Sequence, residues 1–496
     1  MGVSNVLNDL LVLGHSNCSK LLLVKLKTVL TQLQKEIDFK NTFFSGTVKV
    51  KEIVLLYLPS AMLMILLRKF VIQSDYKAKR ESAKFFELSN IAYGAQQINK
   101  SSRLLLTALR LLGPSIPIDF IVLLRSCVRA TAKDPTRRTI CSESVLNATT
   151  AISVDGLDST GWYQLSRGLF SLGFFRAAWV ARENSLELSI SEGVNQLGYD
   201  TSVLRAIEAL LERLSFRAAQ ELLDRFSSEI DSESRIEFSE YLGMMQNNYV
   251  RTDITRDPSE LAHIFTKLIS NRIVAIVGPG APTMRFGTQV DSSDCVIRIK
   301  YPGLANLPDE SFYGSRCDVN YYGNSEILSL SRSSGKQIGE NILLTPVINL
   351  SYSYHELNSP ELRVLNLRFS GPLYRANATA GIRVLFGVLA ELPQKVCVYG
   401  FDFYAGATTY SDEHISFHQK SARLLGHNKS ESLNMKDERA FYRCVSFLRH
   451  DPVSNFCFVQ NLYKAGLFDI EPYGKSILEL TPYQYVERLE EMLGDW

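Results

Sequence analysis

Two glycines follow directly after a short apolar run in the second half of the chain. Residues 273–277 (IVAIV) precede Gly278 and Gly280, with Pro279 between them. A glycine loop after a strand lets backbone N–H groups come close to a phosphate or a ribose. Pro279 removes one of these donors. The loop has the spacing of neither a dinucleotide fingerprint nor a Walker motif, so alone it indicates only that a nucleotide could bind.

A pair of cations lies at the end of the next apolar run. Arg298 and Lys300 are two positions apart, and Asp291 and Asp294 precede them. Alternate residues of a strand share one face, so a strand through this stretch would place both cations on the same side. Two interpretations stay open, an ion pair with Asp291 or Asp294 and a binding site for an anionic donor.

Histidine offers acid–base chemistry further along the chain. An imidazole near its ordinary pKa can take a proton from a hydroxyl group at neutral pH. His427 lies in the segment 425–429 (LGHNK), and His414 and His418 are close by in sequence. A single histidine in a loop is more often structural, so its flanking residues must decide its role.

The elements that must position these residues alternate between strands and helices. Helical segments are expected at 380–392 and 435–448. The expected strands are 273–277, 296–299, 318–322, 342–347, 364–367, 396–399 and 456–460. This alternation predicts an α/β domain with a mostly parallel sheet over residues 261–496. Ligands of such sheets bind at the carboxyl ends of the strands, which is where the glycine loop lies.

Three segments of the chain resemble sialyltransferases. Residues 286–300 (FGTQVDSSDCVIRIK) are similar to the long motif of the animal-type enzymes. Residues 377–410 resemble bacterial lipooligosaccharide sialyltransferases, in which Thr-Ser-Gly opens a helix and Gly-Ile-Asp-Phe-Tyr ends the next strand. In this chain the corresponding residues are 379–381 (TAG) and 400–404 (GFDFY), and Tyr410 has the spacing of the family's second tyrosine. The same family has a Gly-His-x-Lys segment, which residues 426–429 match.

The resemblance implies a role for individual residues. His427 would be the general base that deprotonates the acceptor hydroxyl, and Tyr404 and Tyr410 would hydrogen-bond the departing phosphate. The implied donor-binding positions are Gly278, Gly280, Arg298, Lys300, Asn324, Ser325, Thr379, Ala380, Gly381, Gly400, Phe401 and Asp402. The implied fold is a single Rossmann-like sheet of the GT-A-like sialyltransferase variant.

The implied reaction moves an acidic sugar from a CMP-activated donor to a glycan or glycolipid acceptor. It inverts the anomeric carbon and uses neither an essential metal nor a cofactor. The chain departs from the bacterial pattern at Pro279, Lys300 and Ala380, where the family has Asn, Asn and Ser. The sugar is therefore sialic acid or a relative, and a CMP-Kdo-dependent transferase is the first alternative. A helical-repeat scaffold with an inactive transferase-like domain is the second, and the missing dinucleotide fingerprint disfavours an NAD-dependent oxidoreductase.

Residues 1–260 have few glycines and carry apolar residues at helical spacing, which predicts an α-helical region. The tetrapeptide FRAA occurs at 175–178 and again at 216–219, 41 positions later, each time between two helical segments. The pattern resembles the stacked helical hairpins of a solenoid over about residues 100–250. An irregular helical domain is the alternative.

Composition limits the partners that we expect. The net charge of +2 shows no basic excess, so nucleic acid is not an expected partner. The eight cysteines form no CxxC pair, which indicates reduced thiols in a cytoplasmic protein. The apolar segment 53–67 is shorter than a spanning helix and contains Pro59. A buried helix is favoured there, and a helix lying at the inner face of a membrane is the alternative.

Overall fold

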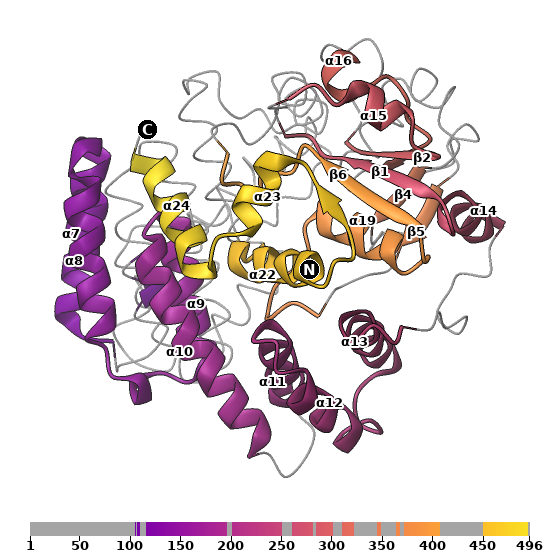
Figure 1. Cartoon of the computed structure of the whole chain (residues 1–496). Helices are drawn as coiled ribbons and strands as arrows, with labels where there is room; N and C mark the ends of the chain where they lie inside the picture. Colours follow the sequence, from indigo (N-terminus) through magenta and orange to yellow (C-terminus); the bar gives the residue numbers. More distant parts are fainter. Residues whose placement is uncertain are drawn as a thin grey trace, which may run out of the picture. The chain divides into compact units, whose positions relative to one another are not determined.

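The computed structural model describes eleven stretches of the chain. They are residues 105, 107–109, 116–195, 201–249, 260–280, 284–300, 310–321, 345–348, 364–367, 372–406 and 450–494. All of them belong to one of the two compact units of the chain, the unit formed by Ala78–Ser421 and Ser430–Trp496. Within these residues, helices precede Ile273 and the sheet begins there (Figure 1). The domain boundary near residue 260 stays a prediction.

The predicted helices on either side of each FRAA copy are present as two helical hairpins. The first hairpin is α9 (Ser159–Ser171) with α10 (Phe175–Val194), and the second is α11 (Thr201–Glu212) with α12 (Phe216–Arg225). The turns of the two hairpins are closed by the same type of hydrogen bond, from an amide to the carbonyl group five residues earlier. The Phe174 amide donates to Leu169 O at 3.0 Å, and the Ser215 amide donates to Leu210 O at 2.8 Å. Helices α7 (Ile118–Lys133), α8 (Arg138–Thr150), α13 (Ser232–Met245) and α14 (Glu260–Ile269) lie before and after the hairpins in the chain. The extended solenoid stays a prediction.

The α/β architecture with a parallel sheet is confirmed. Five parallel strands pair in the order β3-β2-β1-β6-β7. Their bounds are β1 Ile273–Val277, β2 Cys295–Ile299, β3 Val319–Tyr321, β6 Lys395–Tyr399 and β7 Asp469–Ile470. A second parallel pair is formed by β4 (Thr345–Ile348) and β5 (Val364–Leu367), and β4 contacts β3.

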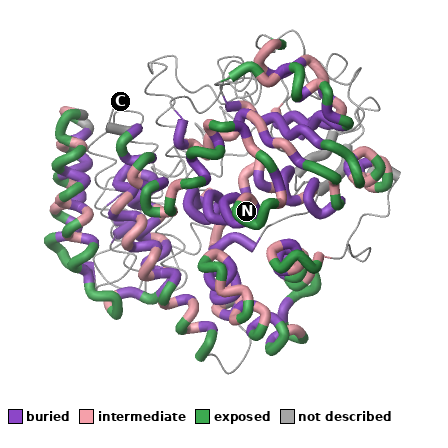
Figure 2. Tube along the Cα trace, viewed as in Figure 1, coloured by how far each residue is buried: buried purple, intermediate pink, exposed green. Residues whose placement is uncertain are grey.

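The core of the sheet is built on β1 and β2, in which every side chain except that of Ile273 is buried. Figure 2 shows these strands as a largely buried part of the trace. A strand that is covered on both sides reads as a continuous apolar run, which explains why these segments could be located from sequence. Asp294 accepts the amide of Ile273 at 2.9 Å, and Asp318 accepts that of Val296 at 2.8 Å. These two carboxylates therefore secure the starts of the two central strands.

The strand that we expected at 456–460 is wrong, because these residues lie within helix α22 (Pro452–Lys464). Every residue from Pro452 to Leu462 is buried, so the helix has no polar face and its sequence lacks helical periodicity. The signal for a helix was Asp451-Pro452. Asp451 accepts the amides of Val453 and Ser454, and proline is favoured at the first helical position.

The remaining described helices are short or lie near the end of the chain. They are α15 (Gly287–Asp291), α16 (Glu310–Tyr313), α19 (Ala380–Leu389), α23 (Pro472–Leu478) and α24 (Pro482–Gly494). The expected helix at 435–448 and the apolar segment 53–67 lie outside the described residues. Among the described helices, none has both the length and the apolar character to cross a membrane. The six described cysteines carry free thiols.

Candidate functional site

The order of the strands creates a topological switch point between β1 and β6. The chain passes from β1 to β2 and β3 on one side, and β6 and β7 lie on the other side of β1. In open parallel sheets, ligands bind in the crevice outside the carboxyl ends of the two strands where the order reverses. Gly278 and Gly400 are the first residues after these two strands.

The loops after β1 and β6 touch through their backbones. The Gly278 amide donates to Tyr399 O at 2.7 Å, and the Gly280 amide donates to Gly400 O at 3.0 Å. A Cβ atom would lie 2.5 Å from Gly400 O if added at Gly278, and 2.6 Å from it if added at Gly280. Gly400 itself has a φ of +67°, which favours glycine. The predicted glycines are therefore required for the close approach of the two loops.

The N-terminus of α19 lies against the same loops. A Cβ atom on Gly381 would overlap the ring of Phe401, so the first turn of α19 packs directly on the loop after β6. Thr379 is the N-cap, and its side chain accepts no hydrogen bond from the first turn. Its own amide donates to Asn455 Oδ1 at 2.9 Å. The positive end of the α19 dipole thus lies at the switch point, where an anion is favoured.

The loop that carries Tyr404 has an unusual backbone. Phe403 has a φ of +50° and Tyr404 a φ of +65°, and each left-handed non-glycine residue costs roughly 1–2 kcal/mol. Hydrogen bonds hold this loop. Among them, Asp402 Oδ1 accepts the Tyr404 amide at 3.0 Å, and Tyr485 Oη donates to Phe403 O at 2.6 Å. Such strain is concentrated at functional sites, where the surrounding structure maintains it.

A buried carboxylate that was not predicted from the sequence supports this loop. Glu471 follows β7 and is only 6% exposed, and its Oε1 accepts the Gly400 amide at 2.6 Å. Burial raises the pKa of Glu471, and hydrogen bonds from the amides of Gly400 and Phe401 partly oppose the shift. The signal in the sequence was Glu471-Pro472, because proline is the first residue of α23 and Glu471 its N-cap.

The prediction that Arg298 and Lys300 share a strand face is wrong. Strand β2 ends at Ile299, and Lys300 has a φ of +59°, so the alternation of a strand does not continue to it. The Lys300 amide donates to Tyr321 O at 2.7 Å, which places Lys300 at the carboxyl end of β2 next to β3. Lys300 thus lies at the edge of the sheet that holds the switch point.

Arg298 is buried and supports the loop that follows α16. Its Nε donates to Arg316 O at 2.7 Å, and its Nη2 donates to Tyr313 O at 2.8 Å and Gly314 O at 2.9 Å. Asp291 accepts the amides of Ser315 and Arg316 in the same loop. A contact between Arg298 and a donor stays a prediction.

The structure brings eight of the predicted residues together at the switch point. They are Gly278, Gly280, Thr379, Ala380, Gly381, Gly400, Phe401 and Asp402, and Tyr404 follows in the same loop. Tyr410, His427, Asn324 and Ser325 lie outside the described residues. The Gly278 and Gly280 amides donate within the contact between the two loops, so the part of this site that favours a phosphate is the N-terminus of α19.

Comparison with known proteins adds no relative to this description. No protein-family model matches the chain, and no curated protein has significant similarity to it.

Proposed function

We propose that this chain is a sialyltransferase-like glycosyltransferase that moves an acidic sugar from a CMP-activated donor to a glycan hydroxyl. The proposal rests on one observation: the β1 loop, the β6 loop and the N-terminus of α19 meet at the switch point. They pack so closely that there is no room for a side chain at the positions of Gly278, Gly280 and Gly381. Residues 379–381 and 400–404, which resemble the bacterial enzymes, form two of these three parts.

The reaction follows from the chemistry of the donor. The acceptor oxygen forms a bond to the anomeric carbon on the face opposite the CMP group, while the bond between that carbon and the phosphate oxygen breaks. His427 takes the proton from the acceptor hydroxyl. Amides at the start of α19, with the phenols of Tyr404 and Tyr410, stabilise the charge that develops on the departing phosphate.

Nucleotide binding is the first test of this proposal. The melting temperature of the full chain is measured with CMP, UDP, GDP and NAD. We expect CMP to stabilise the protein most, and we expect Gly280→Ala to abolish this effect because its Cβ would meet Gly400 O. Gly466→Ala is a suitable control, because nothing lies within 4 Å of its Cβ position, and its φ of +74° makes alanine strained there without any steric overlap. No stabilisation by CMP or CMP-sugars would contradict the proposal.

Turnover is the second test. CMP release from CMP-sialic acid and from CMP-Kdo is measured with glycan acceptors, for the wild type and for His427→Ala and His418→Ala. We expect only His427→Ala to lose activity, by about 10²–10⁴-fold as is typical of a general base. The preferred donor distinguishes the sialyltransferase from the Kdo transferase. Unchanged release by His427→Ala would refute the mechanism, and a wild type that binds CMP without turnover would favour the inactive scaffold.

A further inference from the structure

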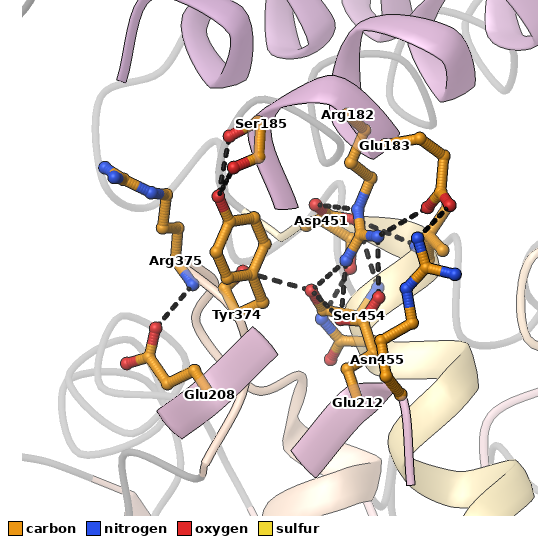
Figure 3. Close-up of polar contacts among 12 residues, drawn as sticks. Arg182, Glu183, Ser185, Glu208, Glu212, Tyr374, Arg375, Asp451, Ser454 and Asn455 are labelled. Atoms are coloured by element: carbon orange, nitrogen blue, oxygen red, sulfur yellow. Dashed lines mark hydrogen bonds and ion pairs between the residues drawn. The ribbon is translucent and has the colours of Figure 1, made fainter. Parts of the chain in front are cut away.

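A buried polar network joins the helical hairpins to α22 (Figure 3). Arg182 of α10 is completely buried, and its Nη1 and Nη2 each donate to one carboxylate oxygen of Glu212 at 2.6 Å. Its Nε donates to Asp451 Oδ2 at 2.8 Å, and Nη2 also donates to Ser454 Oγ at 2.7 Å. Burial lowers the pKa of Arg182, but the charges of Asp451 and Glu212 outweigh this and raise it above its ordinary value. The guanidinium therefore stays charged and holds the start of α22.

Asn455 connects this network to the candidate site. It lies one turn into α22, is 5% exposed, and its Nδ2 donates to Asp451 O at 2.7 Å. The same Nδ2 donates to Asn377 O at 3.3 Å, while Oδ1 accepts the Thr379 amide at 2.9 Å. One side chain thus links the N-terminus of α22 to the residues that begin α19.

We propose that Asn455 is a positioning residue that sets the N-terminus of α19 against the β6 loop so that its amides can bind the donor phosphate. The inference rests on the proposed function. Only an amide can accept the Thr379 N–H and donate to two carbonyl groups at once. A displacement of about 1 Å in a group that holds a substrate can reduce catalysis by about 10²-fold, so this anchoring has a functional consequence.

Gln460 provides a matched control on the same helix. It is also a buried amide, 3% exposed, and its Nε2 donates to Leu478 O and to Leu480 O, both at 2.6 Å. Both of these carbonyl groups lie at or after the end of α23. Replacing Asn455 by alanine removes three hydrogen bonds and replacing Gln460 removes two, but of these two side chains only Asn455 bonds to the residues that begin α19.

The experiment compares Asn455→Ala with Gln460→Ala in the full chain. The melting temperature, the Kd for CMP by calorimetry, and the hydrogen exchange of residues 377–383 are measured. We expect both variants to melt at lower temperature. Only Asn455→Ala should weaken CMP binding, by roughly tenfold or more, and only it should accelerate exchange in 377–383.

Each other outcome bears on a different claim. Equal loss of CMP affinity in the two variants would show an effect of stability alone and would overturn the inference, as would unchanged affinity in Asn455→Ala. If the wild type does not bind CMP, the proposed function fails. Hydrogen exchange then tests separately whether Asn455 positions the N-terminus of α19. Unchanged exchange of residues 377–383 in Asn455→Ala would refute that role.

Discussion

Glu471 illustrates how a single buried carboxylate can make the candidate site sensitive to pH. It lies under the β6 loop, where its Oε1 accepts the Gly400 amide. Burial raises its pKa above the ordinary value of 4.5. Between 4.5 and the raised pKa, the folded protein holds a proton that the unfolded chain releases, so the contribution of this group to stability falls as pH rises through that window.

We expect Glu471→Gln to remove this dependence. Glutamine keeps an oxygen for the Gly400 amide but carries no charge, so the burial penalty no longer changes with pH. The difference in melting temperature between Glu471→Gln and the wild type should therefore grow in favour of the variant as pH rises above about 4.5. Glu479→Gln serves as the control, because Glu479 is the C-cap of the helix whose N-cap is Glu471, and its side chain is 59% exposed. Parallel curves for the wild type and Glu471→Gln would contradict the prediction.

The residue types at the switch point were predictable because glycine has few substitutes there. Gly278, Gly280 and Gly400 follow strands that read as apolar runs, so their place in the sheet could be read from the sequence. Glu471 and Asn455 were not predicted, since each acts on a segment more than 70 positions away in the chain. The partner of a buried polar side chain depends on which segments pack together, and the sequence around it does not contain that information.

At the level of elements, the two helical hairpins differ at one matched position of their turns. Gly173 has a φ of +81° and Leu214 a φ of +58°, and each lies two residues before an FRAA copy. The turn geometry is shared, but the second hairpin has a leucine where the backbone favours glycine. Leu214 is 45% exposed, so its side chain contributes little burial in return.

Leu214→Gly should therefore stabilise the protein by up to about 1 kcal/mol, because it relieves the left-handed strain of a non-glycine residue. Gly173→Ala should destabilise it by a similar amount for the reverse reason. Urea denaturation followed by circular dichroism measures both changes. A loss of stability in Leu214→Gly would mean that the Leu214 side chain makes a contribution larger than its exposure indicates.

The error at α22 shows what limits element prediction from sequence. A helix buried on all sides and a strand buried on both sides can have the same apolar run, so hydrophobic periodicity does not separate them. The Asp451-Pro452 cap does separate them, because it specifies the start of a helix. The capping signal was therefore more informative than the composition of residues 456–460.

At the scale of the whole compact unit, the buried ion network of Arg182 ties the hairpins to the α/β part. We expect Arg182→Met to destabilise the protein by about 3–5 kcal/mol, since it leaves Glu212 and Asp451 buried without their partner. The triple variant that adds Glu212→Gln and Asp451→Asn should recover part of this loss, because it removes the uncompensated charges.

The midpoint of urea unfolding measures these changes. Arg217→Met is the control, because its ion pair with Glu221 joins side chains that are 94% and 67% exposed, and we expect no measurable change. A single transition in the wild type would indicate that the hairpins and the sheet unfold together. If Arg182→Met has the stability of Arg217→Met, the network does not hold the two parts together.

The sequence by itself determined the parallel α/β class, six of the seven predicted strands, the helices around the FRAA repeat and the glycines of the switch point. These features depend on local hydrophobic patterning and on backbone geometry, and residues close together in the sequence determine both. The tertiary structure decided the strand order, the burial of Arg298, and the anchoring of α19 by Asn455. These depend on contacts between distant segments, whose pairing follows from the packing of the whole unit.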